Sequence, residues 1–337
     1  MKRLFTATAL VLFLSFALPY NSPAPLIYTP GVGWTYERVG KEGKWTRTRA
    51  KEQLAVAQKA LEEKDYSLAR KAAAHTVKRW PLSDYAPEAQ FIDGQSLEAQ
   101  GRYEQAFKSY QKLVDDYPKF DKYDEVLERQ YNIANEFLDG RWFRLWRYIP
   151  MPPSMDKTAS MYESLIESGP FSDVAPQAQM KIAEAREKKK NYKAAVKARE
   201  IAANRYHDRP GIAAEALFGT GLAYQKQAKT AEYDQGAAGK AIDAFTDFIS
   251  LYPEHEQVKE AQELIDSLRT EQARGAFKTA EYYQKRKKWR SALIYFNDVV
   301  NKDPNSTYAI KARERIEFLK EIVEELDKID EKFKDEK

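Results

Sequence analysis

The feature that most constrains this chain is a helical pattern that recurs between residues 66 and 304. Its clearest copy is Gly101–Pro118, in which Ala106, Tyr110 and Val114 fall on one face of a helix that the final proline ends. The key alanine recurs at Ala69, Ala106, Ala195, Ala241 and Ala292. A proline stands twelve residues after it in four copies, at Pro81, Pro118, Pro253 and Pro304. We therefore expect each copy to be one helix of a repeated unit.

A second helix is predicted before each copy. Small residues precede the key alanines by twelve positions and let two antiparallel helices approach closely; they are Ala57, Gly94, Ala183 and Ala280. A proline-serine element, with alanines five and eight residues after the proline, starts at Pro81, Pro170 and Pro304. Its serine or the next residue is a natural N-cap, and Pro87 and Pro176 then fall in a first helical turn.

These features are the tetratricopeptide pattern, whose usual unit is about 34 residues long. Ala69 and Ala106 are 37 residues apart, whereas the next copy, framed on Ala159, follows only after 53 residues. Insertions therefore interrupt a regular stack. We predict an all-α tetratricopeptide-repeat superhelix, or α-solenoid, of five to six helix hairpins in residues 48–308. Residues 309–337 form a capping helix and a charged tail.

The N-terminus has the build of an export signal. Lys2 and Arg3 precede an uncharged run, so residues 1–18 are interpreted as a signal peptide or signal anchor. A short buried helix is the alternative. Residues 19–47 form an arm rich in proline, glycine and aromatic residues, in which Trp34 and Tyr36 suggest packing on a partner or on the first repeat. An arm that is disordered in isolation is the other reading.

Composition excludes several chemistries. The 337 residues include no cysteine, and 55 basic against 51 acidic residues give a net charge of +4. A thiolate metal site is excluded, and no strongly basic nucleic-acid surface is indicated. His75, His207 and His255 lack metal-site spacing, and Gly219-Thr-Gly221 indicates close helix packing rather than a dinucleotide loop. We expect no catalytic, cofactor-binding or metal-binding residues and no small-molecule substrate.

The insertion at residues 140–156 is the main candidate for binding. It interleaves arginine and aromatic residues at Arg141, Trp142, Phe143, Arg144, Trp146, Arg147 and Tyr148. Such residues dominate protein interfaces and also suit the headgroup zone of a bilayer. Three readings stay open: docking of a protein partner, contact with a membrane, and folding back onto the repeats to fill the gap that the insertion opens.

The export signal, the repeats and the proline-serine element together resemble the outer-membrane assembly lipoprotein family BamD, also called YfiO, over residues 48–320. The resemblance implies a non-enzymatic periplasmic scaffold at the inner face of the outer membrane of a Gram-negative-type cell. It also implies protein partners, namely the barrel-assembly subunit and unfolded β-barrel precursors, with peripheral membrane association. Family members carry a lipid-attachment cysteine after the signal, which this sequence lacks. The alternatives are a general periplasmic adaptor for cell-wall or division machinery and a solenoid-bodied cell-wall enzyme.

Overall fold

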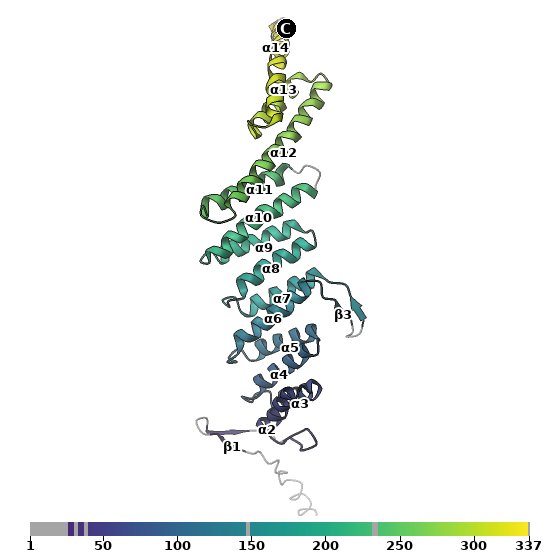
Figure 1. Cartoon of the computed structure of the whole chain (residues 1–337), viewed down its shortest axis with the longest axis vertical. Coiled ribbons are helices and arrows are strands. Elements are labelled where there is room, and N and C mark those ends of the chain that lie inside the picture. The colour runs from purple at the N-terminus through teal and green to yellow at the C-terminus, as the bar shows by residue number, and fades with distance from the viewer. Residues whose placement is uncertain (1–25, 30–32, 37–39, 146–148, 231–234, 336–337) are drawn as a thin grey trace, which may run out of the picture. The chain divides into compact units, whose positions relative to one another are not determined.

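The structure is a computed structural model that describes residues 26–29, 33–36, 40–145, 149–230 and 235–335 (Figure 1). Within these ranges the chain forms 13 helices and two short antiparallel strand pairs. It divides into two compact units. The first contains residues 1–135 and 143–151, and the second contains residues 136–142 and 152–337. The predicted all-α tetratricopeptide fold class is confirmed.

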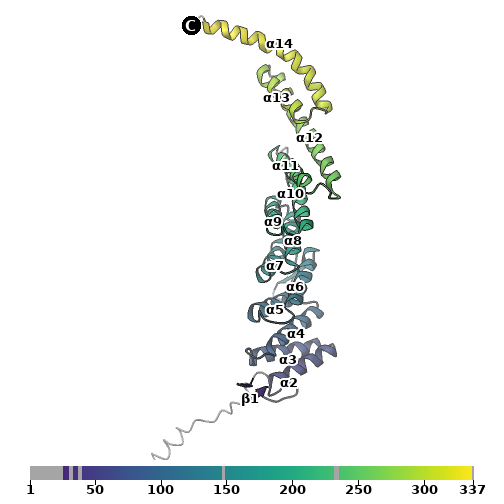
Figure 2. The same ribbon diagram turned by 90° about the vertical axis from the view of Figure 1, so that its left-hand side faces the viewer.

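By their order in the chain, the helices alternate between the first and the second position of a repeat. The first members are α2 (Ala50–Glu62), α4 (Ala86–Ala99), α6 (Tyr123–Leu138), α8 (Ala175–Lys188), α10 (Pro210–Thr230) and α12 (Val258–Lys285). The second members are α3 (Tyr66–Arg79), α5 (Tyr103–Asp116), α7 (Met155–Ser168), α9 (Tyr192–Arg205), α11 (Gln235–Leu251) and α13 (Trp289–Lys302). Helix α14 (Thr307–Asp335) follows the last pair. Figure 2 shows the helices from α7 to α11 stacked each on the next.

The key alanines mark the helix contacts, as the sequence predicts. All five are fully buried, and four of the second-member helices begin three residues before the alanine and span 14 residues. Gly94 shows why the first helix carries a small residue at this contact: a Cβ there would lie 2.3 Å from Cε1 of Tyr110, the residue four places after the key alanine. The tyrosine ring therefore occupies the space that a side chain at position 94 would need.

The frame of the third pair differs from the prediction. Helix α7 begins at Met155, so the residue three places later, Thr158, stands where Ala106 stands in α5. Thr158 is fully buried, and Pro170 follows it by twelve residues as in the other copies. Ala159 is also fully buried, but it is one residue out of register. Counted from Ala159, this repeat is one residue short before Pro170. Counted from Thr158, which takes the alanine position, it has the usual length.

Two long helices account for the longer spacings in the second unit. Helix α10 has 21 residues, and its Gly221, rather than a residue twelve before Ala241, opens space for the ring of Phe245 at 2.5 Å. The close helix packing predicted for this glycine is confirmed. Helix α12 has 28 residues and serves two cores, because Ile265 packs with Phe248 while Phe277 packs with Phe296 and α14.

The turns inside four pairs share one backbone conformation. A residue with positive φ follows the first helix at Lys64, Gly101, Lys190 and Lys287, with φ between 58° and 66°. Its N–H bonds back to the helix, as in Gly101 N to Glu98 O at 2.8 Å. This is the left-handed helix end that glycine prefers, and three of the four positions carry lysine instead.

The proline-serine element does not cap helices as predicted at its first two copies. Helices α4 and α8 begin at Ala86 and Ala175, and their N-cap residues make no side-chain cap bond. Pro87 and Pro176 do stand in the first turn, as predicted. Only in the third copy does the serine act as expected, because Ala309 N donates to Ser306 Oγ at 3.1 Å.

The end of the arm is packed on the first helix pair. Strands β1 (Leu26–Thr29) and β2 (Gly33–Tyr36) form an antiparallel pair earlier in the arm. After it, Gly40 N donates to Thr48 O at 2.8 Å, and Gln53 of α2 donates to Trp45 O at 3.1 Å. The Trp45 ring packs against the core shared by α2, α3 and α4.

Helix α14 covers the exposed side of the last pair. Ala312, Ile316 and Leu319 are buried in one core with residues of α12 and α13, and Arg290 of α13 pairs with Asp327. The three helices lie next to one another (Figures 1 and 2).

Candidate interaction surface

The insertion between α6 and α7 starts from a defined helix end. Gly140 has a φ of 102° and its N–H bonds to Phe137 O at 3.2 Å, while Arg141 N bonds to Glu136 O at 3.0 Å. The Arg141 guanidinium also pairs with the Glu136 carboxylate, with Nε to Oε2 at 2.9 Å. Arg141 is thus held against the last turn of α6.

The insertion itself is an antiparallel strand pair. Strand β3 (Phe143–Leu145) pairs with β4 (Ile149–Met151), with Phe143 opposite Met151 and Arg144 opposite Pro150. Because proline has no N–H, the Arg144–Pro150 pair is of the non-hydrogen-bonded kind, and the proline nitrogen faces the outer edge of β4. That edge cannot accept a further strand in regular register, so a partner there would meet side chains rather than backbone.

The predicted binding residues fall into different environments. Trp142 is 57% exposed, and Ile149 and Met151 of β4 are 47% and 40% exposed, whereas Phe143 is only 2% exposed. Arg144 lies in β3 and Trp34 and Tyr36 lie in β2, but their side chains are outside the described set. Trp146, Arg147 and Tyr148 lie outside the described residues altogether. The sequence analysis did not single out Ile149 and Met151, because an isoleucine and a methionine are usually buried and only the fold shows that these two are exposed.

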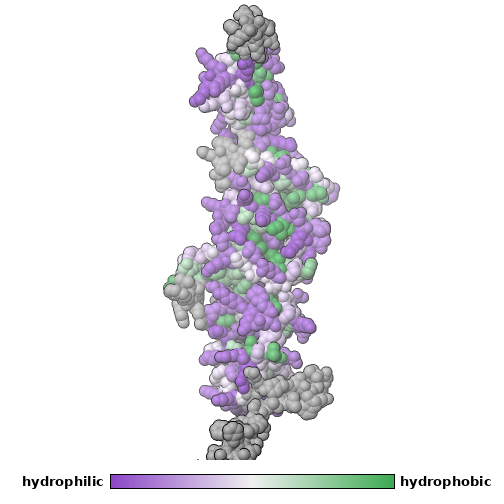
Figure 3. Space-filling model, turned by 180° about the vertical axis from the view of Figure 1, so that it is seen from behind, coloured by the Kyte–Doolittle hydropathy of each residue, from purple (hydrophilic) through white to green (hydrophobic). Residues whose placement is uncertain are grey.

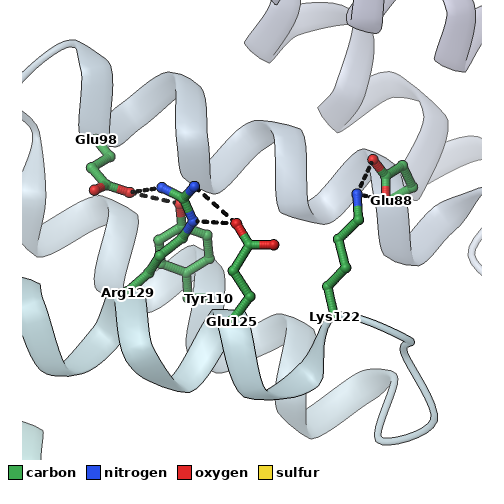
Figure 4. Close-up of polar contacts among 6 residues, drawn as sticks. All are labelled: Glu88, Glu98, Tyr110, Lys122, Glu125 and Arg129. Carbon is green, nitrogen blue, oxygen red and sulfur yellow. Dashed lines mark hydrogen bonds and ion pairs between the residues drawn. The ribbon is translucent and has the colours of Figure 1, made fainter.

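A charged cluster joins three helices of the first unit (Figure 4). Tyr110 OH donates to Glu98 Oε2 at 2.8 Å, and Arg129 of α6 bonds to the same oxygen at 3.2 Å and to Glu125 at 2.9 Å. Burial and the Glu98 charge raise the pKa of Tyr110, so the hydroxyl stays protonated and acts as the donor. Every charge has a partner, so the cluster fixes neighbouring repeats rather than offering a site.

A similar cluster lies in the second unit. Arg199 lies four residues after the key alanine, at the position where α5, α7, α11 and α13 carry an aromatic ring, and it pairs with Glu187 of α8. Lys226 of α10 bonds to the second Glu187 oxygen at 2.6 Å. Gly219 makes room for the arginine, since a Cβ there would lie 2.4 Å from Arg199 Nε. Sequence reasoning missed this cluster, although an arginine in an aromatic position is a readable signal.

Beyond these clusters, the described residues offer no further obvious chemical site. Seen from behind, hydrophilic residues dominate and hydrophobic residues form small separate groups (Figure 3). Across the described ranges, no three histidine or acidic side chains gather in a metal-binding arrangement. None of the helices in those ranges combines the length and the apolar character needed to cross a membrane. The proposed signal segment lies outside the described residues.

Comparison with known proteins gives two family matches. Residues 153–303 match the model of the family YfiO, described as an outer membrane lipoprotein, and residues 54–119 match a tetratricopeptide-repeat model. No curated protein sequence matches the chain.

Similar solved structures are tetratricopeptide proteins of low identity. A tetratricopeptide protein from Parabacteroides merdae is 13% identical, with 80% of this chain and 98% of that chain covered and a TM-score of 0.33. The C-terminal part of a repeat protein from Cytophaga hutchinsonii is 15% identical, with coverages of 78% and 87% and a TM-score of 0.37. PilW, a type IV pilus biogenesis factor, is 14% identical, with coverages of 77% and 96% and a TM-score of 0.27. From the two family matches and the helix pairs, this chain is a tetratricopeptide-repeat protein that is similar to the YfiO family over residues 153–303.

Proposed function

We propose that this protein is a non-enzymatic periplasmic scaffold that serves the assembly of β-barrel proteins in the outer membrane. Its partners in this role are the barrel-assembly subunit and unfolded barrel precursors. The observation that carries the proposal is the YfiO match over residues 153–303, which spans the helices from α7 to α13. Stacked helix pairs ordinarily bind other proteins, and a scaffold role uses that property directly.

The exposed residues of the insertion are the proposed docking contacts. Exposed tryptophan is a frequent anchor at protein interfaces, and Ile149 and Met151 add apolar area on a strand whose edge is closed by Pro150. Phe143 is buried and so does not offer its ring to a partner. We therefore assign docking to Trp142, Ile149 and Met151 and folding back to Phe143.

Substitution separates these two roles. We expect Trp142→Ala and Ile149→Ser each to lower the recovery of envelope proteins in affinity purification while leaving the melting temperature within about 2 °C. Phe143→Ala should lower the melting temperature, because truncating a buried phenylalanine costs about 3–5 kcal/mol. Phe171→Ala is the control, since Phe171 is 94% exposed at a different turn. Equal partner recovery from the Trp142 and Ile149 variants and the wild type would remove the insertion from the binding surface.

Depletion of the protein tests the function itself. Levels of outer-membrane β-barrel proteins should fall, while soluble periplasmic proteins stay constant, since only barrels need this assembly route. Normal barrel levels with altered cell-wall glycans would instead favour an adaptor for cell-wall or division machinery and would contradict the proposal.

A further inference from the structure

The second unit carries two runs of basic residues at corresponding turns, and the structure separates them. In the run Lys188–Lys190, Lys188 pairs with Glu184 at 3.1 Å and donates to Leu138 O at 2.9 Å. Lys189 pairs with Asp156. Two of these three cations are therefore used to hold α8 against neighbouring elements.

The side chains of the run Lys285–Lys288 do not hold neighbouring elements together in this way. All four side chains are exposed, and within the described part of the chain none of them forms an ion pair. The Arg286 guanidinium lies 4.3 Å from the centroid of the Tyr282 ring, which is itself 49% exposed. The nearest following cation, Arg290, is paired with Asp327 and so adds no free charge. Four free cations and an exposed aromatic ring thus share one turn.

Lys288 occupies the N-cap of α13, a position where a residue with a side-chain acceptor would stabilise the helix more. The residue four places before the key alanine is the N-cap of the second helix. At this position Asp65 and Asn191 accept bonds from Leu68 N and Ala194 N, whereas the basic Arg102 of α5 makes no cap bond. Lys288 is the N-cap of α13 and makes no cap bond. A cation also opposes the positive end of the helix dipole there. Unlike Arg102, whose guanidinium bonds to Gln100 and Gln105, Lys288 adds to its turn a further positive charge that is unpaired among the described residues.

We propose that the turn Lys285–Lys288, together with Tyr282, binds the anionic phospholipid headgroups of a membrane surface. Uninterrupted cations on long side chains match a surface of phosphates, and tyrosine favours the headgroup region. A protein interface of this charge would need matching carboxylates in fixed positions, whereas lipid headgroups rearrange around the cations. The site supplies a membrane contact to a sequence that has no cysteine for lipid attachment. It does not depend on the proposed role in barrel assembly.

Vesicle co-sedimentation of the full chain tests the proposal. One probe is vesicles of phosphatidylcholine alone, and the other is vesicles of equal parts phosphatidylcholine and phosphatidylglycerol. The wild type should bind only the second, and binding should weaken as salt is raised. Each cation near an anionic surface contributes about fivefold, so replacing all four by glutamine should weaken binding at least tenfold.

A charge-matched variant controls for net charge. It replaces four exposed lysines that form no ion pair in the described part of the chain, Lys71→Gln, Lys119→Gln, Lys197→Gln and Lys311→Gln. This control should bind anionic vesicles nearly as the wild type does, and both variants should melt as the wild type does. Equal binding by the two variants would overturn the proposal. Unchanged vesicle binding by the turn variant, with loss of a co-purifying protein, would also overturn it and assign the turn to an acidic protein partner. Barrel levels after depletion report separately on the proposed function.

Discussion

At the scale of single residues, the fold depends on pairs in which a small residue faces a large one. Gly94 faces Tyr110, Gly221 faces Phe245 and Gly219 faces Arg199, each at a distance that excludes a Cβ. The large partner differs in chemistry, but the space it needs is the same. The small residue is therefore fixed by its neighbour across the helix contact rather than by its own helix.

This pairing predicts opposite effects for two glycine substitutions. Gly94→Ala should lower stability by about 1–3 kcal/mol, because the new Cβ would lie 2.3 Å from a fully buried ring whose hydroxyl is held by Glu98. Gly211→Ala should leave stability unchanged or slightly raised, since nothing lies within 4 Å and alanine favours helix. Urea unfolding of both variants measures the difference. A neutral Gly94→Ala would mean that the α4–α5 contact is looser than described.

The key alanines and small residues could be predicted from sequence because their spacing repeats. Thr158 could not, because a threonine in an alanine position breaks the residue match while keeping the volume close. The aromatic position had the same limit, since Arg199 is recognisable only once Glu187 and Gly219 are known to surround it. The residue type at a repeat position cannot be predicted from the repeat alone when the residue that accommodates it lies far away in the sequence.

At the scale of elements, the ends of the second helices were predictable, whereas the first helices were predictable in position but not in length. Helices α3, α5, α7, α11 and α13 each end two residues before a proline. The local sequence therefore predicts where they end. The length of α12 is set by packing on two different cores, and no local signal marks it. The strands β3 and β4 were also not predicted, because arginine and aromatic residues fit strands and loops alike.

The junction of the arm with the first helix pair contains a titratable element. His75 of α3 lies edge-on between Trp45 of the arm and Trp80, with both ring centroids at 5.7 Å. Burial lowers the pKa of His75 below its ordinary value of 6.5, and the charges of Arg79 and Lys78 lower it further. The neutral imidazole is therefore the form that fits this contact.

Stability should depend on pH through His75. Because the folded-state pKa is lowered, the unfolded chain binds the proton more readily at mildly acidic pH, so stability present above pH 6.5 is lost as the pH falls through the folded pKa. Thermal unfolding between about pH 7.5 and pH 5.5 should show this loss, and His75→Phe should reduce it while keeping a ring between the tryptophans. His207→Gln, at an exposed position, should retain the wild-type dependence. An unchanged pH slope in His75→Phe would assign the effect to another group.

At the scale of the whole molecule, the helices contact mainly their neighbours in sequence. Stability in such a chain is a sum of local terms, and one part can open while another stays folded. The chain also divides into two compact units, so a single free energy of unfolding does not describe it. The repeat pattern predicted a single stack, and the boundary near residue 135 follows only from the contacts.

Two matched core truncations test the independence of the units. Leu113 of α5 in the first unit and Leu319 of α14 in the second are both fully buried, and leucine-to-alanine changes cost about 2–5 kcal/mol at such sites. Under native conditions, Leu113→Ala should speed amide hydrogen exchange in α4 and α5 and leave α12 to α14 unchanged, as measured by mass spectrometry of peptides. Leu319→Ala should do the reverse, because its contacts lie with α12 and α13. Faster exchange throughout the chain in either variant would mean that the repeats unfold as one cooperative body and that the division into units has no energetic meaning.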